Sequence, residues 1–449
     1  MATLLPDMLA ALDEGMARRS LLDTYLTGSQ PLAYLAPEAR QAIGNRFAIM
    51  STNLPRTAVH ALAERVRVTG FTGAHAEQAW ALWRACDLDQ MAPVAHREAL
   101  GLGEAFVIVW ANNAGRTTVT VESPHQVAVL RDPATRETIA AVKRWTTKQG
   151  TTAVVYEPEV ITRYHSDALG ESTTTGFRAV EVIPNPLLTV PVVPLRNSDR
   201  LLGQPTSEVD DLIPLVDGLN KLLADMMVAS EYSGRPRRWA TGIELEEAPV
   251  LDADGNPTGE TVPVNPFPEA NRMMTVEAAE ARVGQLDATD LSSYEAAVRV
   301  LQAQVSAVTG LPPHLLGVHG DQPASADALR ASEASLTAKA EARQQMFGKS
   351  WEQVGRLMVA VNEGIDPAAV DLSVQWADAA TRSVAQEADA VVKLFTVGLL
   401  PASYALKRLG YSDDEVRLIE QARRSDALQT SNYQTESQAR RAATSRKTA

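Results

Sequence analysis

The 449-residue sequence is poor in cysteine and in long hydrophobic runs, and each shortage excludes a class of protein. The single cysteine, Cys86, cannot form a disulfide within the chain, so we expect a buried thiol in a helix and a reducing compartment. No run of about 18 apolar residues occurs, so no segment is expected to span a membrane. The first 26 residues are predicted to form an amphipathic helix, without the hydrophobic centre of a signal peptide.

Positive charge is also in short supply. Lys and Arg number 42 against 55 Asp and Glu, which gives a net charge of −13. Such a surface repels phosphate, which disfavours a tight clamp on nucleic acid but leaves weak contact open. The chain does have 45% apolar residues, enough for sizeable cores, over a length that suits about three domains.

Catalytic and metal-binding motifs are incomplete. Gly348-Lys349-Ser350 ends like a Walker A phosphate loop, but the glycine expected five residues earlier is Arg343, and the segment has a helical pattern. His314 and His319 lie near Asp321 without a cysteine or a second acidic cluster, and no glutamate closes a calcium loop at residues 252–259. We therefore expect no metal, no cofactor and no enzymatic activity.

The first 200 residues change from helical to extended patterning. Helical apolar spacing marks residues 37–49 and 75–86, with a break at Asn53-Leu54-Pro55. From Glu104 the alternation is that of strands, predicted at residues 106–110, 117–121, 140–145, 153–156 and 160–164. The fold class expected from this order is α+β.

Two helices with apolar stripes then flank a segment rich in proline and turns, residues 235–287. The first covers residues 207–230, with Pro214 at its start or as a kink. The second carries apolar residues at spacings of three and four: Leu291, Tyr294, Val298, Leu301, Val305 and Val308. So narrow a stripe needs a partner helix, and we expect the two to pack antiparallel. An ordinary helical hairpin within one monomer is an equally good reading of this pattern alone.

The second helix stops at Thr309-Gly310-Leu311-Pro312-Pro313, because proline lacks the amide that continues a helix. A polar loop follows, and a longer helix is predicted from about Ser325 to Val361. Beyond it we expect a strand at residues 370–376, short helices at 383–396, 401–409 and 412–422, and a disordered basic tail.

Several short motifs in this order resemble the portal proteins of tailed bacteriophages, in particular the branch found in siphophages. They are Val193-Pro194-Leu195-Arg196-Asn197 before the helix at 208–230, the segments 237–242 and 284–286, Thr309 to Gly317, and Ser325 to Arg330. The resemblance implies a ring of about twelve copies, with a heterologous interface repeated by rotation. It also implies the following regions: wing 1–203, stem helices 204–231 and 288–311, clip 232–287, channel loop 312–324, long wing helix and strand 325–378, helical crown 379–426 and disordered basic tail 427–449.

Candidate site residues follow from the pattern and the resemblance together. The channel loop is Gly317, Val318, His319, Gly320, Asp321, Gln322 and Pro323, which is polar, contains glycine and lacks Lys and Arg. Contact with a partner at the clip is expected of Arg235, Arg237, Arg238 and Trp239. Packing of the stem is expected of Leu212, Leu219, Met226, Leu291, Tyr294, Val298, Leu301 and Val305.

The resemblance implies a conduit for double-stranded DNA at one capsid vertex. Its implied partners are further copies of the chain, DNA held weakly, the terminase large subunit, a head-tail adaptor, and the major capsid and scaffolding proteins, without any membrane. Its implied location is the virion, after assembly in the host cytoplasm. Two alternatives stay open: a nucleotide-driven packaging enzyme, which the broken Walker pattern disfavours, and another head-tail connector or minor capsid protein, which the length disfavours.

Overall fold

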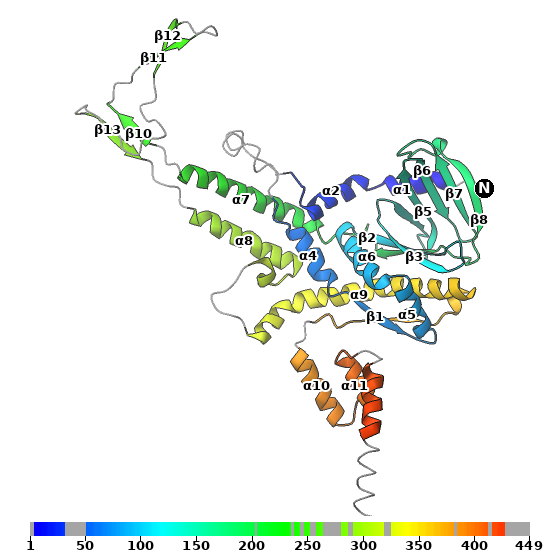
Figure 1. Ribbon diagram of the computed structural model, residues 1–449. Helices are drawn as coiled ribbons and strands as arrows, with labels where there is room; N and C mark the ends of the chain where they lie inside the picture. Colours follow the sequence, from blue (N-terminus) through cyan, green and yellow to red (C-terminus); the bar gives the residue numbers. More distant parts are fainter. Residues whose placement is uncertain are drawn as a thin grey trace, which may run out of the picture. The chain divides into compact units, whose positions relative to one another are not determined.

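The computed structural model describes residues 4–31, 51–202, 204–234, 238–242, 247–251, 257–263, 280–285, 291–317, 325–380, 384–411 and 415–426. The chain divides into two compact units, residues 1–379 and 380–449. The first unit mixes helices with antiparallel sheets (Figure 1), so the expected mixture of helix and strand is confirmed.

The N-terminal helices differ from the sequence prediction at glycine and proline. The first 26 residues form two helices, α1 (Leu5–Asp13) and α2 (Met16–Thr27), because Gly15 between them has a left-handed φ of +73°. The expected break at Asn53-Leu54-Pro55 is wrong in part. Asn53 is left-handed, but Leu54 and Pro55 open helix α4 (Leu54–Ala63), where the missing proline amide costs nothing. The helix expected at residues 37–49 lies outside the described residues.

Two further helices, α5 (Ala76–Ala85) and α6 (Leu88–Leu102), complete the N-terminal part. The sequence predicted α5 but not α6, which contains Pro93. Cys86 lies between the two helices and is half-buried, with its Sγ 3.6 Å from the carbonyl oxygen of Thr117. Burial raises the pKa of this thiol, so it stays protonated at neutral pH.

All sheets are antiparallel. One sheet has the order β3-β2-β9, a second has the order β4-β5-β6-β7-β8, and β1 pairs with β14 across some 300 residues of sequence. The strands predicted at residues 106–110 and 117–121 are confirmed as β2 and β3, which pair antiparallel, whereas β1, β4 and β8 were not predicted. The strands are β1 (Val68–Thr72), β2 (Glu104–Ala111), β3 (Thr117–Glu122), β4 (Val127–Arg131), β5 (Thr138–Thr147), β6 (Gly150–Tyr156), β7 (Val160–Ser166), β8 (Arg178–Pro184), β9 (Val192–Arg196) and β14 (Ser373–Trp376).

Strand β2 is buried on both faces, which explains its continuous apolar run. Val107 and Val109 join the main core with the helices, while Phe106 and Ile108 point the other way, onto β4, β5 and β9. Helix α1 covers the five-stranded sheet through a separate apolar cluster.

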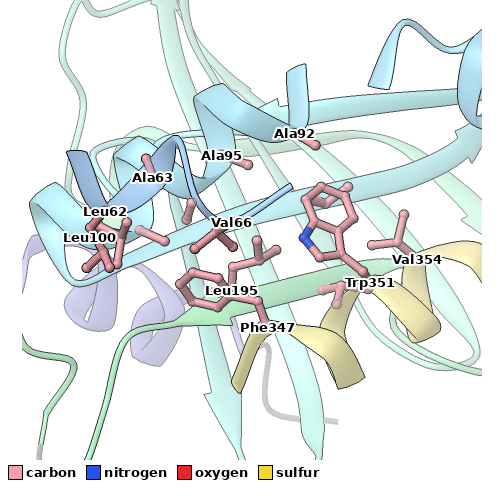
Figure 2. Packing of buried hydrophobic residues seen from close by; sticks show 14 of the residues in the cluster. Leu62, Ala63, Val66, Ala92, Ala95, Leu100, Leu195, Phe347, Trp351 and Val354 are labelled. Atoms are coloured by element: carbon pink, nitrogen blue, oxygen red, sulfur yellow. The ribbon is translucent and has the colours of Figure 1, made fainter. Parts of the chain in front are cut away.

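The main core lies along α9 (Ala326–Glu363), a 38-residue helix about 57 Å long. The Ser325 hydroxyl caps it by accepting a hydrogen bond from the amide of Ala328 at 3.2 Å, close to the predicted start. Figure 2 shows Phe347, Trp351 and Val354 of α9 packed toward Ala92 and Ala95 of α6. Alanine on α6 leaves the space that these large side chains fill.

The second unit is helical. It contains α10 (Val384–Thr396), α11 (Ala402–Arg408) and a helix at residues 415–426. The sequence predicted all three within a few residues, because their apolar spacing is regular. The expected disordered tail, residues 427–449, lies outside the described part of the chain.

Candidate functional site

The two striped helices form a hairpin that flanks the turn-rich segment. Residues 210–212 form a short 3₁₀ turn, and α7 (Ile213–Gly234) follows with Pro214 in its first turn, as one of the two predicted options. Helix α8 (Ser292–Thr309) returns beside α7 (Figure 1). Gly218 marks their close approach, since a Cβ at this position would lie 3.6 Å from Cδ1 of Leu301.

The strands at the far end continue the same antiparallel pairing. β10 (Arg238–Thr241) pairs with β13 (Arg282–Gln285), so the end of α7 and the start of α8 are brought together. Between them β11 (Glu247–Leu251) pairs antiparallel with β12 (Pro257–Pro263). The segment at residues 235–287 is thus an insertion between two helices that pack on each other.

Burial along the hairpin is uneven. Leu212, Leu219 and Val305 are buried, and Leu212 and Val305 belong to the main core cluster. The other residues expected in the stem packing are only half-buried: Met226, Leu291, Tyr294, Val298 and Leu301. Val300 and Val308 on α8 are 61% and 40% exposed. Within a single chain the predicted apolar seam of α8 is therefore buried at Val305 and only partly covered at its other positions.

Ion pairs and hydrogen bonds fix the base of this hairpin to the core. Glu208, just before α7, accepts hydrogen bonds from the guanidinium of Arg343 on α9 at 2.6 and 2.9 Å, and both side chains are largely buried. The Tyr25 hydroxyl of α2 donates to Asp217 of α7 at 2.8 Å. Burial, followed by the neighbouring Asp217, raises the pKa of Tyr25 to about 12, so the phenol stays neutral and keeps its proton for this bond.

A compact turn links α8 to the loop. Gly310 ends α8 with a φ of +73°, and the Ser306 hydroxyl donates to the carbonyl oxygen of Leu311 at 2.6 Å. Lys339 of α9 donates to the carbonyl oxygen of Val308 at 2.9 Å, where a cation favours the negative end of the helix dipole. A 3₁₀ turn (Pro313–Leu316) follows and ends at Gly317. The loop therefore leaves from a braced position.

Several predicted site residues lie outside the described part of the chain. Of the channel loop only Gly317 is described, with a φ of +75° and open space around its Cα; Val318, His319, Gly320, Asp321, Gln322 and Pro323 are not. Of the clip residues, Arg235 and Arg237 are outside, whereas Arg238 and Trp239 lie on β10 opposite Gln285 and Gly284. Their assignment to a channel and a partner surface stays a prediction.

No sequence pattern indicated the residues that brace the hairpin. Tyr25 and Asp217 are 192 residues apart, and Glu208 and Arg343 are 135 apart. Charged residues near helix ends are common, and nothing in a single sequence pairs them at such distances. Only the helical stripes could have indicated where the contacts fall.

The weak catalytic motifs have structural roles. Gly348, Lys349 and Ser350 lie in the middle of α9, where the Ser350 hydroxyl donates to the carbonyl oxygen of Pro194 at 2.8 Å. A phosphate loop needs exposed backbone amides, which a helix interior does not offer. His314 lies 3.5 Å from Glu333, and within the described residues no group of three His, Cys, Asp or Glu side chains is arranged to hold a metal ion. Nor is any helix there both long and apolar enough to cross a bilayer.

Comparison with solved structures found similar chains in particle necks. The neck of an empty GTA particle computed with C6 symmetry contains a chain that matches with a TM-score of 0.47 and 14% identity, over 86% of this chain and 96% of that one. The neck of a native GTA particle computed with C12 symmetry gives a TM-score of 0.45 and 14% identity, over 88% and 98% of the two chains.

Sequence comparison identified relatives with higher identity. The portal protein of Mycobacterium phage L5 is 31% identical over 446 residues, which cover 92% of this chain and 88% of the relative. The portal protein of Mycobacterium phage D29 is also 31% identical, over 91% and 88% of the two chains. The family model described as phage portal protein, SPP1 Gp6-like, matches residues 48–429. The chain therefore belongs to the SPP1 Gp6-like family of phage portal proteins.

Proposed function

We propose that copies of this chain form a closed ring of about twelve subunits at one capsid vertex, through which double-stranded DNA passes during packaging and ejection. Membership of the portal family supports the conduit role. The observation that best supports a ring is the partial exposure of the hairpin of α7 and α8. Its outer seam leaves apolar side chains of α8 without full cover in one chain, and a neighbouring hairpin would cover them.

The regions expected from the sequence acquire roles in this proposal. Residues 1–203 and 325–378 are the wing, α7 and α8 the stem, 232–287 the clip, and 379–426 the crown. The clip would meet the terminase large subunit or a head-tail adaptor, and the wing would meet capsid and scaffolding proteins. The virion would be the final location, after assembly in the host cytoplasm.

Imaging tests the ring directly. Negative-stain micrographs of the purified full-length protein should show rings with a central hole. A population that stays compact and monomeric at high protein concentration would overturn the proposal.

The channel loop, residues 317–323, is proposed to line the narrowest part of the conduit. It contains no Lys or Arg, so it would meet phosphates by steric contact only, with little gain from counterion release. Replacing Asp321 and Gln322 by Lys would add attraction at every copy. The packaged DNA length per capsid should then fall at low salt and recover at high salt, while rings stay normal. Unchanged packaging in both conditions would remove the loop from the DNA path.

A nucleotide-driven packaging enzyme is the alternative from another class. The position of Lys349 inside α9 argues against it, because the ammonium pairs with Glu352 at 2.8 Å and no phosphate loop surrounds it. Purified protein should show no ATP hydrolysis of its own. Robust turnover that disappeared in Lys349→Ala would favour the enzyme.

A further inference from the structure

A groove of about 890 Å³ lies in the first unit, away from the hairpin. Its walls are the turn between β4 and β5, the end of β9 with the segment that follows it, the middle of α9, and the 3₁₀ turn Pro367–Ala369. We call it the basic groove, because its charged lining consists of Arg131, Arg136, Arg196, Arg200, Lys349 and Arg356 against Glu137 and Asp199.

The net charge of the basic groove is opposite in sign to the net charge of the whole chain. Its lining carries six positive and two negative side chains, a net of +4, whereas the whole chain carries −13. Five of the six cations are arginine, the cation whose planar fork suits carboxylates and which is enriched in protein interfaces. Repulsion among so many like charges is unfavourable unless an acidic group approaches them.

Ion pairs within the chain neutralise only some of the cations that line the basic groove. Arg196 lies 3.8 Å from Glu104 and Lys349 lies 2.8 Å from Glu352. No ion pair reaches Arg136 or Arg200 among the residues that the structure describes, and both are exposed. The pKa of Arg131 is lowered, by burial first and then by Arg196 and Arg136, which places these three positive groups close together.

Apolar surface adjoins the positive charge. A second pocket, of about 550 Å³, shares Thr189, Pro367 and Ala368 with the basic groove, so the two are continuous. Leu188 in this second pocket is 73% exposed and is held at a left-handed φ of +51°, while Leu201 in the basic groove is 80% exposed. Exposed apolar side chains beside arginines form a surface that a protein contact can bury.

We propose that the basic groove and the adjoining pocket receive an acidic and partly apolar face of the neighbouring copy in the ring. This inference rests on the proposed ring, whose heterologous contact joins one face of a subunit to a different face of the next. The neighbour supplies negative charge because the chain outside the groove is strongly acidic. The leucines would become buried in the contact, which would exclude water around the ion pairs.

Nucleic acid fits this surface less well. Phosphates would gain nothing from Leu188 and Leu201, and Glu137 and Asp199 would repel them.

The test is assembly of the full-length protein, followed by mass photometry. Arg136→Glu with Arg200→Glu should raise the subunit concentration needed for half-maximal ring formation by about tenfold or more at roughly 0.1 M salt. At high salt the difference from wild type should shrink, because the new repulsion is screened. Leu201→Ser should weaken rings at both salt concentrations, since its contribution is apolar.

The matched control is Arg56→Glu with Arg116→Glu, which reverses two exposed arginines outside the groove and should leave assembly unchanged. All three variants should keep the wild-type melting temperature as dissociated subunits. If the groove variants formed rings as readily as the wild type, the inference would be overturned and the proposed function would still stand. Intact rings that lose only their retention of a 30-base-pair DNA probe would also overturn it, in favour of nucleic acid. A wild type that forms no rings would refute the proposed function itself.

Discussion

The core along α9 and the hairpin of α7 and α8 are both built from apolar helix stripes, yet they are buried to very different degrees. In the core, Trp83 and Trp351 meet edge to face at 5.0 Å, and Trp351 is fully buried. In the hairpin, Leu301 is half-buried and Val300 is exposed. Apolar surface that stays exposed after folding can still be buried by association with another subunit, which would be favourable. The core therefore stabilises the fold of the subunit, whereas the hairpin keeps apolar surface that the proposed ring would cover.

The largest effect should come from the core. Trp351→Ala removes an indole packed on Trp83 and His96, and should lower the free energy of unfolding by about 3–5 kcal/mol. Urea unfolding of dissociated subunits measures this. Gln353→Ala, at an exposed site on the same helix, should change stability by less than about 0.5 kcal/mol. Equal effects of the two changes would deny that α9 is the centre of the core.

A pair of adjacent substitutions separates packing within the subunit from packing between subunits. Leu301→Asp places a charge against α7 and should cost the subunit about 2–3 kcal/mol. Val300→Asp should cost the subunit less than about 0.5 kcal/mol, because the side chain is exposed, yet it should reduce the ring fraction. The readouts are urea unfolding and mass photometry. If Val300→Asp assembled like wild type, the open side of the hairpin would not face a neighbour.

Low pH should destabilise the core because of one buried histidine. His96 is completely buried, accepts a hydrogen bond from the Trp351 indole at 2.8 Å, and has its pKa lowered by burial from 6.5 to about 3. Below pH 6.5 the His96 imidazole is protonated in the unfolded chain but stays neutral in the folded core. The free energy of unfolding therefore falls as the pH drops from 6.5 toward 3. Between pH 6.5 and 5 this amounts to about 2 kcal/mol.

Unfolding of His96→Gln over the same pH range checks this cause. Its stability should be lower at pH 7 and should depend less on pH than that of the wild type. An identical slope in both proteins would assign the acid sensitivity to other groups.

The smallest effect should come from the junction between core and hairpin. Tyr25→Phe deletes the hydrogen bond to Asp217 and should cost about 1 kcal/mol, because the partner carboxylate is only partly buried. Asp217→Asn tests the other partner, and the double variant should cost less than the sum of the single changes. Strict additivity in this cycle would mean that the two groups do not interact in solution.

The sequence predicted elements whose residues repeat with a clear period. β2, α8 and α9 lie close to their predicted positions, because a buried strand and a striped helix have patterns that tertiary context does not alter. β8 was missed because every residue but Ile183 is exposed and the strand ends in Pro184. α6 was missed because Pro93 and Gly101 interrupt a helix that packing nevertheless favours.

The candidate site divides in the same way. The hairpin and its insertion were visible in the sequence, since two stripes around a turn-rich segment have few other solutions. The basic groove was not, because Arg131, Arg196 and Lys349 come from three separated segments that only the fold brings together. Local sequence predicts the elements, whereas surface charge depends on how distant segments meet.

The length of α9 has a mechanical consequence. Its first fully buried residue is Leu336, and Glu333 is held by Arg65 at 3.1 Å, so the helix is clamped from about residue 333 onward. Residues 326–332 extend the helix by about 10 Å beyond this clamp, toward the loop. A force applied to the loop would therefore reach the core through this segment and the contacts of Glu333 and Leu336.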